Sequence, residues 1–360
     1  MVQAQKITII VNNLGVGGAE RVVVNEVHEM MRMGIDVSLI TLRPVPVKSF
    51  ISELKLPKEK MYEVPFSNLM DRGGWKKLVP LLKTLQPDLL ITQLWYANTI
   101  GRIAAFKAGV RRVISFEQNV YDDLKTWKMY LVDFVLQFFC TKVIAVSEAV
   151  KDSLVRHWIL PSRIEVIYNS VDLEAFVANT DGNTFLKNEQ NSFVFGFIGR
   201  LIHQKAVDVL IDAYANIQHR TMLVIAGQGT ERENLEALVK KKGLEQKVMF
   251  VGVQKNIPKF LTSIDCFVLA SRYEGLPLVL IEAMAAGKPV IVSDFESAKE
   301  VVNDKNGIIV PKENPAALTQ AMQRVMENAD LRKQMSVEAR KSAEKFSITN
   351  HVRAILRYAN

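Results

Sequence analysis

Short runs of β-branched and other apolar residues alternate along most of this chain with segments of helical spacing. Ile7–Val11, Val37–Thr41, Leu89–Thr92 and Val143–Val146 are nearly continuous apolar runs, and such runs are typical of parallel strands that are buried on both faces. Amphipathic segments such as Ala19–Met33 lie between them. The alternation predicts strand–helix–strand units, which build a doubly wound parallel sheet.

The alternation is interrupted once, from Ala178 to Ser192, by a polar stretch that is rich in Asn, Asp and Gly. Stretches of this composition are typical of linkers. Apolar runs then resume, at Phe193–Ile198, Met222–Ala226, Val248–Val251, Cys266–Leu269 and Pro289–Val292. A chain of 360 residues is also too long for one ordinary core, which favours two domains.

The sequence therefore predicts two Rossmann-like α/β domains that face each other across a central cleft. We expect the first domain over residues 1–175, a linker over 176–192, the second domain over 193–345 and, over 346–360, a C-terminal helix that packs back toward the first domain. Hydrophobic residues make up 49% of the chain and charged residues 23%, which excludes a disordered or fibrous protein.

The cysteines, the apolar runs and the net charge limit the setting in which the protein works. Cys140 and Cys266 lie in apolar runs, so we expect core residues in a reducing compartment rather than a disulfide or a metal site. The longest apolar run, Met129–Cys140, is broken by Asp133 and Gln137 and is too short to span a bilayer. Because the N-terminus also leads directly into a strand, we expect a cytoplasmic protein. The net charge of +8 favours anionic partners, although an ordinary solvated surface explains it equally well.

A glycine-rich turn follows the first predicted strand and includes Gly17 and Gly18. Glycines let the backbone approach a ligand, and the helix that follows offers unpaired N–H groups to an anion. The turn fails in part as a dinucleotide fingerprint, because Glu20 replaces the third glycine and no acidic residue ends the second strand. Arg43 near that strand end keeps an NADP-binding enzyme open, and a tight turn without a ligand is the structural alternative.

Two cations, Arg200 and Lys205, follow the first strand of the second domain on a turn that begins with Gly199. Arginine can bind phosphate through two hydrogen bonds and lysine as a point charge, so the turn suits a diphosphate. Taken alone, two ordinary surface cations explain the pattern as well. Because both are turn residues, we expect their replacement by alanine to impair binding and to leave the fold intact.

A loop and a helix start follow the strand Cys266–Leu269. The loop carries Glu274, and Pro277 fits the first turn of a helix that holds Glu282 in its second turn. The backbone N–H groups there suit phosphate, and carboxylates can accept hydrogen bonds from sugar hydroxyls. A purely structural role for Glu282, as a partner of the helix dipole, is the alternative.

Taken together, these segments resemble the retaining GT-B glycosyltransferases of the GT4 family over nearly the whole chain. The matching parts, in order, are Gly17–Arg21, Val146–Ala149, Val166–Phe176, Gly199–Lys205, Gly227–Gly229, and Glu274 and Glu282 with seven residues between them, followed by Ala283–Pro289. Each part is a weak signal, whereas the ordered set is specific. The resemblance implies a hexosyltransferase of polysaccharide or glycolipid assembly that takes its sugar from a nucleotide sugar, expected to be a UDP-sugar.

The resemblance also implies roles for individual residues. Arg200 and Lys205 would hold the donor diphosphate and stabilise the leaving group, and Glu274 would bind hydroxyls of the donor sugar; these three are the catalytic candidates. Glu282 would bind the ribose, and Gly17 would lie against the diphosphate. The remaining donor-binding candidates are Gly18, Gly199, Gly227, Gly275 and Leu276.

Two positions depart from the family pattern. Many relatives carry a histidine where this chain has Gln118, in the stretch Glu117-Gln118-Asn119 that supplies the acceptor-side candidates. A glutamine can hydrogen-bond a hydroxyl but takes no proton at neutral pH, so the leaving phosphate would have to accept the proton of the acceptor. Ala206 replaces a glycine that often follows the lysine, which narrows the conformations that the turn tolerates.

The first domain carries a segment that mixes cations, leucines and an aromatic residue, from Arg72 through Trp75 to Lys83. A second basic cluster consists of Arg102, Lys107, Arg111 and Arg112. We hypothesise that this face rests on anionic lipid at the inner side of the cytoplasmic membrane and receives a lipid-linked saccharide. An ordinary amphipathic helix explains the segment equally well. Nucleic acid fits less well, because stacking aromatics are not interleaved with the cations.

Three other functions stay open at this level. An epimerase of the same fold would turn over a nucleotide sugar without an acceptor, an NADP-dependent oxidoreductase would bind nicotinamide, and a non-catalytic module would bind the sugar nucleotide without turnover. The GT4 family works without a bound metal, so we expect no metal or other cofactor; Asp122-Asp123 lacks the spacing of an Asp-x-Asp metal loop.

Overall fold

The computed structural model describes residues 5–47, 49–120, 125–177 and 192–359. The chain divides into two compact units, of which the first is Met1–Ser170 with Ile348–Asn360 and the second is Val171–Ser347. The Asp122-Asp123 pair and most of the linker predicted over 176–192 lie outside the described residues. Each unit is a Rossmann-like α/β domain with a parallel sheet, as the sequence predicts.

In the described part of the first unit, seven strands form one parallel sheet in the order β3-β2-β1-β4-β5-β6-β7. The strands are β1 (Lys6–Val11), β2 (Asp36–Thr41), β3 (Met61–Glu63), β4 (Leu89–Gln93), β5 (Val113–Glu117), β6 (Lys142–Ala145) and β7 (Ile164–Val166). The helices are α1 (Gly18–Arg32), α2 (Arg72–Leu85), α3 (Trp95–Ala108), α4 (Trp127–Leu136), α5 (Glu148–Arg156) and α14 (Ile348–Leu356), with short 3-10 turns η1 (Lys58–Lys60), η2 (Gln137–Phe139) and η3 (Pro161–Arg163).

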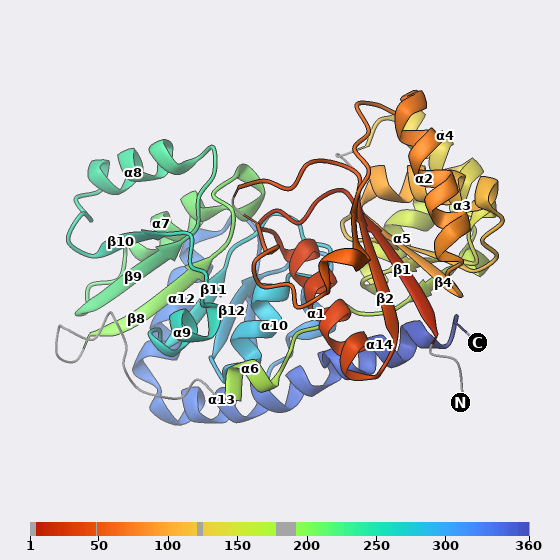
Figure 1. Cartoon of the computed structure of the whole chain (residues 1–360). Coiled ribbons are helices and arrows are strands. Elements are labelled where there is room, and N and C mark those ends of the chain that lie inside the picture. The colour runs from red at the N-terminus through yellow and green to blue at the C-terminus, as the bar shows by residue number, and fades with distance from the viewer. Residues whose placement is uncertain (1–4, 48, 121–124, 178–191, 360) are drawn as a thin grey trace. The chain divides into compact units, whose positions relative to one another are not determined.

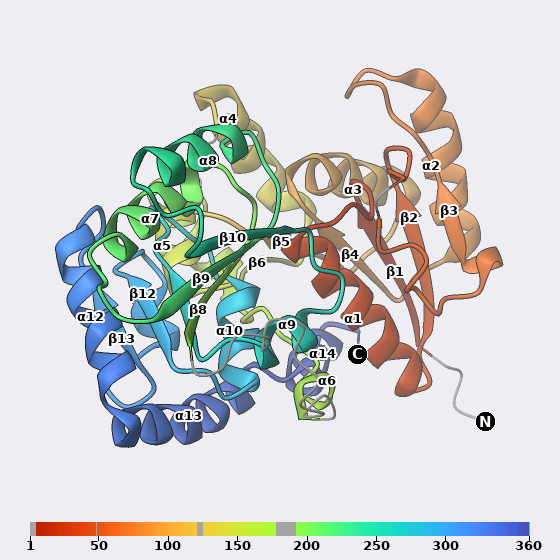
Figure 2. The ribbon, with the colours of Figure 1, turned by 90° about the vertical axis from the view of Figure 1, so that its left-hand side faces the viewer.

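The described part of the second unit holds a six-stranded parallel sheet in the order β10-β9-β8-β11-β12-β13. Its strands are β8 (Phe193–Ile198), β9 (Thr221–Ala226), β10 (Val248–Gly252), β11 (Cys266–Leu269), β12 (Val290–Ser293) and β13 (Gly307–Val310). Its helices are α6 (Glu174–Val177), α7 (Val207–Tyr214), α8 (Arg232–Lys241), α9 (Ile257–Thr262), α10 (Leu278–Ala285), α11 (Ala298–Val301), α12 (Pro315–Glu327) and α13 (Ala329–Ala343), with η4 (His203–Lys205) and η5 (Glu344–Phe346). Figure 2 shows β8, β9 and β10 side by side.

The apolar character of the strands explains the two cores. All residues from Ile7 to Val11 in β1 are buried, as are those from Val194 to Ile198 in β8, because helices cover both faces of a doubly wound sheet. Helix α14, the last element of the chain, packs on α1 within the first unit (Figure 1). The first unit is therefore assembled from both ends of the chain.

Both cysteines are buried and unpaired, as the sequence predicts for core residues. Burial raises the pKa of the Cys140 thiol and also that of the Cys266 thiol, so neither is an easily ionised nucleophile. Among the helices of the described residues, none is both long and apolar enough to cross a bilayer.

The structure corrects one part of the predicted basic face. Arg102 is not a surface cation: its side chain is buried and forms an ion pair of 2.9 Å with Asp133. Helix α2 turns Leu78 and Leu82 inward, and the ring of Trp75 packs edge-on against Phe66 at a centroid distance of 5.2 Å. This helix therefore buries its apolar side in the ordinary way, and its cations are exposed on the opposite side.

Candidate functional site

The candidate donor site lies at the carboxyl ends of β8 and β11 in the second unit. These strands are neighbours in the sheet although they are not consecutive in the sequence. The order of the strands reverses at this position, and ligands of open α/β sheets bind at the carboxyl edge of such a reversal. The turn after β8 carries Lys205 and the loop after β11 carries Glu274. Topology alone thus brings two predicted site residues to one place.

Lys205 and Glu274 are in direct contact. The ammonium group of Lys205 forms an ion pair with Oε1 of Glu274, and the hydroxyl of Ser271 donates to the same oxygen at 2.7 Å. The side chains of Lys205 and Glu274 are only 12% and 7% exposed. Within the described part of the chain, Oε2 of Glu274 accepts no hydrogen bond. The site therefore combines an oriented cation with a carboxylate oxygen that can still accept a hydrogen bond from a ligand hydroxyl.

A second set of contacts fixes the turn of Lys205 to the loop of Glu274. Arg272 pairs with Asp208 at 2.9 Å and with Glu313 at 2.7 Å, and its backbone N–H donates to the carbonyl of Gln204. Burial opposes ionisation of Asp208, but the hydrogen bond and the charge of Arg272 outweigh it and hold the pKa of Asp208 below its usual value. Arg272 and Ser271 are not among the predicted site residues, although both lie in the same loop as Glu274.

Gly199 and Gly227 hold the turns after β8 and β9 against each other, backbone to backbone. The N–H of Gly199 donates to the carbonyl of Ala226 at 3.0 Å. Gly227 has a φ of +139°, and a Cβ atom added there would lie 1.8 Å from the carbonyl oxygen of Gly199. Only glycine fits such a position. The predicted glycine turn therefore shapes the backbone on which Arg200 and Lys205 stand.

We expect Gly227→Ala to destabilise the second unit and to weaken binding of UDP. The strained φ alone costs about 1–3 kcal/mol, and the clash with Gly199 must displace the turn as well. Thermal unfolding and UDP titration would measure the two effects. Gly243→Ala is the matched control, because Gly243 also has a positive φ, of +66°, but a Cβ there would meet nothing within 4 Å. Equal effects of the two substitutions would contradict the close approach at Gly227.

Ala206 occupies the left-handed region, with φ of 47° and ψ of 44°. Glycine adopts this conformation without steric cost, whereas a residue with a Cβ is strained in it. The departure from the family's glycine thus leaves the backbone path intact.

Of the other donor-side candidates, Arg200, Gly275 and Leu276 lie on the same loops, whereas Glu282 lies in α10 and the two glycines of the first unit lie at α1. Arg200 is exposed, and in the described part of the chain no carboxylate pairs with it. Gly275 and Leu276 are buried directly after Glu274. Glu282 is partly exposed in α10, the helix that begins four residues after Glu274. Gly17 and Gly18 belong to the first unit, where Gly17 is the N-cap and Gly18 the first residue of helix α1.

The acceptor-side candidates lie at the carboxyl end of β5 in the first unit, where Glu117 is the last strand residue, and they differ in their surroundings. Both oxygens of Glu117 are engaged, Oε1 by the amide of Asn98 at 3.0 Å and Oε2 by Lys125 at 3.3 Å, and the residue is buried. Asn119 is partly exposed. Gln118 is almost fully buried and belongs to a chain of hydrogen bonds.

That chain of hydrogen bonds runs from Gln118 to the last helix. Nε2 of Gln118 donates to Oε1 of Gln93 at 3.1 Å, Nε2 of Gln93 donates to Glu26 at 2.6 Å, and the other oxygen of Glu26 contacts Nε2 of His351 at 2.8 Å. On the opposite side, Asn169 donates to Oε1 of Gln118 at 2.9 Å. Since a carboxylate only accepts, Glu26 fixes the direction of both glutamine amides. The sequence could not reveal this network, because Glu26 and His351 stand 325 residues apart.

We expect Gln118→Glu to destabilise the protein by about 1–3 kcal/mol at neutral pH. The new carboxylate cannot donate to Oε1 of Gln93, whose orientation Glu26 holds, so two acceptor oxygens would face each other. The protonated form can donate, so the folded state raises the pKa of the new carboxyl. The loss of stability is therefore complete at pH values above that raised pKa, and it shrinks as the pH falls toward about 4. Unfolding in denaturant across this pH range would measure the loss of stability. A loss that does not change with pH would contradict the assigned direction of the hydrogen bonds between Gln118, Gln93 and Glu26.

Four buried polar atoms of this unit lack a hydrogen-bond partner among the described residues: the hydroxyl of Tyr96, Oδ1 of Asn98, Oδ1 of Asn169 and Oγ of Ser170. Asn169 contacts Gln118 directly. An unpaired buried carbonyl oxygen is costly. The side chain next to Gln118 thus has an acceptor that a ligand hydroxyl could satisfy.

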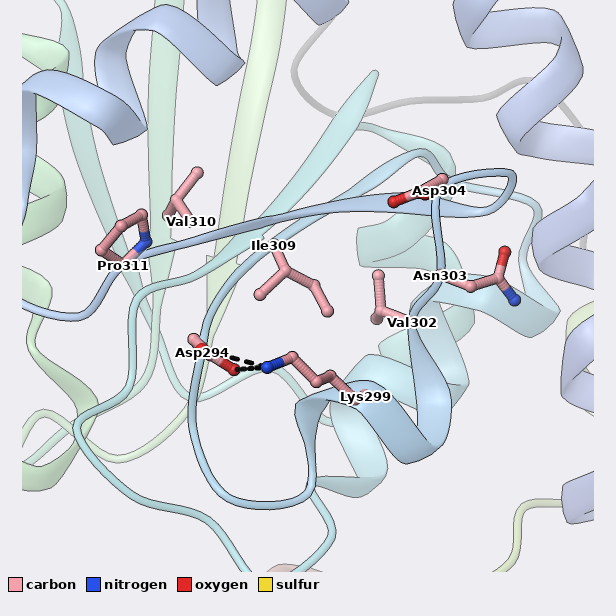
Figure 3. A pocket seen from close by; sticks show the side chains of 8 residues that line it. All are labelled: Asp294, Lys299, Val302, Asn303, Asp304, Ile309, Val310 and Pro311. Atoms are coloured by element: carbon pink, nitrogen blue, oxygen red, sulfur yellow. Dashed lines mark hydrogen bonds and ion pairs between the residues drawn. The ribbon is translucent and has the colours of Figure 1, made fainter.

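A cavity of about 540 Å³ lies elsewhere in the second unit (Figure 3). Its lining residues are Asp294, Lys299, Val302, Asn303, Asp304, Ile309, Val310 and Pro311. Asp294 and Lys299 form an ion pair of 3.3 Å inside it, and the remaining charge is the carboxylate of Asp304. No predicted site residue lines this cavity, and its acidic lining does not suit a diphosphate.

Comparison with known proteins assigns the chain to a family. Residues 183–342 match the family "Glycosyl transferases group 1" and residues 16–175 match "Glycosyltransferase Family 4". The chain therefore belongs to the GT4-type glycosyltransferases, and its two Rossmann-like domains are those of the GT-B fold. This assignment confirms the family that the sequence motifs indicate.

Two curated relatives and one solved structure illustrate the similarity. The chain is 28% identical, over 98% of its length and 99% of the relative, to an N-acetylgalactosamine-N,N'-diacetylbacillosaminyl-diphospho-undecaprenol 4-alpha-N-acetylgalactosaminyltransferase of Campylobacter jejuni. It is 28% identical, over 86% of its length and 85% of the relative, to a UDP-Gal:alpha-D-GlcNAc-diphosphoundecaprenol alpha-1,3-galactosyltransferase of Escherichia coli. The crystal structure of Anabaena HepE in complex with UDP has a TM-score of 0.87 at 21% identity, covering 98% of this chain and 99% of that one, and shows the shared fold.

Proposed function

We propose that this glycosyltransferase moves a hexosyl residue, with retention of anomeric configuration, from a UDP-sugar to a lipid-linked saccharide. The observation that carries the donor assignment is the Lys205–Glu274 ion pair at the reversal of strand order in the second unit. A cation suits the diphosphate, and the open oxygen of Glu274 suits a sugar hydroxyl. Arg200 supplies a second cation on the same turn, Glu282 binds the ribose, and Gly17 with Gly18 contacts the diphosphate.

The residues of the donor site act on the leaving group. As the bond between the sugar and the diphosphate breaks, negative charge develops on the phosphate oxygen, and Lys205 and Arg200 stabilise it. No protein group needs to accept the acceptor's proton in this scheme. Gln118 stays neutral and positions the acceptor hydroxyl, together with Oδ1 of Asn169, while the departing phosphate takes the proton. We propose that the reaction requires no bound metal, because the two cations supply the positive charge.

The acceptor class is supported by the relatives. The names of the Campylobacter and Escherichia relatives each describe a saccharide joined through diphosphate to undecaprenol. We propose an acceptor of this class, and with it a place of action at the cytoplasmic face of a membrane. Glu117 is a weaker acceptor-side candidate than Gln118 or Asn119, because both of its oxygens are already engaged.

A thermal-shift panel on the full chain tests the donor. We expect one UDP-sugar to stabilise the protein by about 2.7 kcal/mol when present at one hundred times its Kd. Stabilisation by NADP and not by any UDP-sugar would overturn the proposal in favour of an oxidoreductase. Incubation of the bound UDP-sugar without an acceptor then distinguishes an epimerase, which would produce a second UDP-sugar. For the transfer product, the anomeric coupling in a proton NMR spectrum reports retention or inversion.

A further inference from the structure

Helix α4 differs from an ordinary surface helix, because it buries polar side chains and exposes apolar ones. Its polar residue Asp133 and the adjoining Gln137 are buried. Leu136 is buried, but most of the large apolar side chains are exposed, with fractions of 65% for Trp127, 48% for Leu131, 37% for Phe134, 48% for Val135 and, just beyond the helix, 51% for Phe138. A helix in water normally buries such a face.

Specific hydrogen bonds hold the helix in this orientation. Asp133 accepts from Arg102 at 2.9 Å, from Lys125 at 2.8 Å and from the indole of Trp95 at 3.2 Å. Gln137 donates to the carbonyl of Trp158 at 3.3 Å and accepts from the backbone N–H of Leu160 at 2.8 Å. Rotation of the helix would leave the buried charges of Asp133 and Arg102 unpaired, which is costly. The outward apolar face is therefore a fixed feature of the fold.

The exposed apolar surface continues from α4 onto the neighbouring segments. Phe106 at the end of α3 packs against Phe139 at a centroid distance of 4.9 Å, and Tyr130 stacks on His157 at 4.0 Å. Trp158 is exposed although its φ is +71°, a strained value for a bulky residue. We call the exposed apolar residues Phe106, Trp127, Leu131, Phe134, Val135, Phe138, Val155, Trp158 and Leu160 the α4 face. Helices α3 and α4 pack together in this unit (Figure 1).

Cations accompany the α4 face. The guanidinium of Arg163 lies 5.5 Å from the ring centre of Phe138, and the ammonium of Lys128 lies 5.8 Å from that of Trp127. Between Arg102 and Arg163, and outside the buried cluster of Arg102, Glu117, Lys125 and Asp133, the sequence has eight Lys and Arg against four Asp and Glu. A second copy of the same face would be repelled by this excess. An anionic lipid surface complements it, and tryptophan side chains favour the boundary between lipid and water.

We propose that the α4 face inserts into the surface of a bilayer that contains anionic phospholipid. The apolar side chains enter the boundary between headgroups and acyl chains, and the surrounding cations contact lipid phosphates. The membrane contact thus lies on α4 rather than on α2, whose apolar side is buried. This inference goes beyond the transfer reaction, because the surface contains none of the proposed donor or acceptor residues.

Flotation of the full chain with vesicles tests the proposal without any sugar nucleotide or acceptor, so its outcome is independent of the proposed transfer reaction. At low salt we expect binding to vesicles of phosphatidylcholine mixed with phosphatidylglycerol to be at least about tenfold tighter than to phosphatidylcholine alone. The combined substitution Leu131→Ser, Phe134→Ser and Phe138→Ser is expected to weaken binding by at least about tenfold. The matched control replaces three exposed apolar residues of the second unit, Met249, Val253 and Val337, by serine and should bind as the wild type does.

Thermal unfolding shows whether the serine variant is folded. If it is not, fluorescence quenching of the wild type tests the proposal instead. Lipids brominated in their acyl chains should quench the fluorescence of Trp127 and Trp158, and the quenching should fall in the variant Trp127→Phe with Trp158→Phe. Absence of flotation of the wild type, or equal flotation of the folded serine variant, would overturn the proposal. A third outcome would also overturn the proposal: a dimer, seen in analytical ultracentrifugation, that the serine substitutions dissociate while vesicle binding stays unchanged. The α4 face would then join two copies of the chain.

Discussion

Replacing Arg200 by alanine is expected to lower the rate of glycosyl transfer by about 10²–10³, the usual loss when one preorganised donor to a developing anion is removed. Arg200 is exposed, and in the described part of the chain no carboxylate pairs with it, so thermal unfolding should not change. Steady-state kinetics with a UDP-sugar and melting of the same sample measure the two quantities.

Arg220→Ala is the matched control for this substitution. Arg220 is also exposed and belongs to the second unit, but it directly precedes β9 and therefore lies at the amino edge of the sheet, opposite to the proposed site. The control should keep the wild-type rate. A wild-type rate in Arg200→Ala itself would remove the phosphate assignment for this residue.

Lys205→Ala is expected to reduce both transfer and stability. The loss of rate has the same origin as at Arg200, again about 10²–10³. The loss of stability arises because Glu274 stays buried without its cation, which costs about 3 kcal/mol, at the lower end of the range for broken buried pairs because Ser271 still donates to the carboxylate. From the sequence alone we expect an intact fold after this substitution, and the ion pair with Glu274 revises that expectation.

The double variant Lys205→Ala with Glu274→Gln separates the two effects. Removal of the second charge should restore most of the stability that unfolding in denaturant reports, whereas transfer should stay low because both the cation and the carboxylate of the donor site are missing. If the double variant were no more stable than Lys205→Ala, Lys205 and Glu274 would not be coupled in the folded protein. Recovery of transfer together with stability would mean that Lys205 acts only through the fold.

The sequence predicts the longer strands well and the short ones poorly. β1 and β8 are continuous apolar runs, and their bounds are close to the predicted ones. β3 and β7 have three residues each and contain Glu63 and Glu165, so no periodicity can distinguish them from a loop. Their place in the sheet is decided by the strands that they pair with, which is information that a short window of sequence does not contain.

In the candidate site, too, some contacts can be predicted from the sequence and others cannot. Lys205 and Glu274 follow strand ends in the sequence, so the rule on strand ends indicates that they meet. Arg272 contacts Asp208 and Glu313 across 64 and 41 residues, and nothing in their spacing reveals this. The orientation of α4 was equally hidden, because in the run Met129–Cys140 the two polar residues look like breaks in an apolar helix. The structure shows that they are instead its buried contacts.

The path of the chain through the first unit has a consequence for its synthesis. This unit needs α14, which follows the whole of the second unit in the sequence. A nascent first unit therefore waits until α14 has been synthesised before His351 can reach Glu26. Until then, the carboxylate that directs the glutamine amides lacks its histidine. The ribosome thus makes α14 only after the whole of the second unit, which couples formation of the acceptor-side hydrogen-bond network to synthesis of both units.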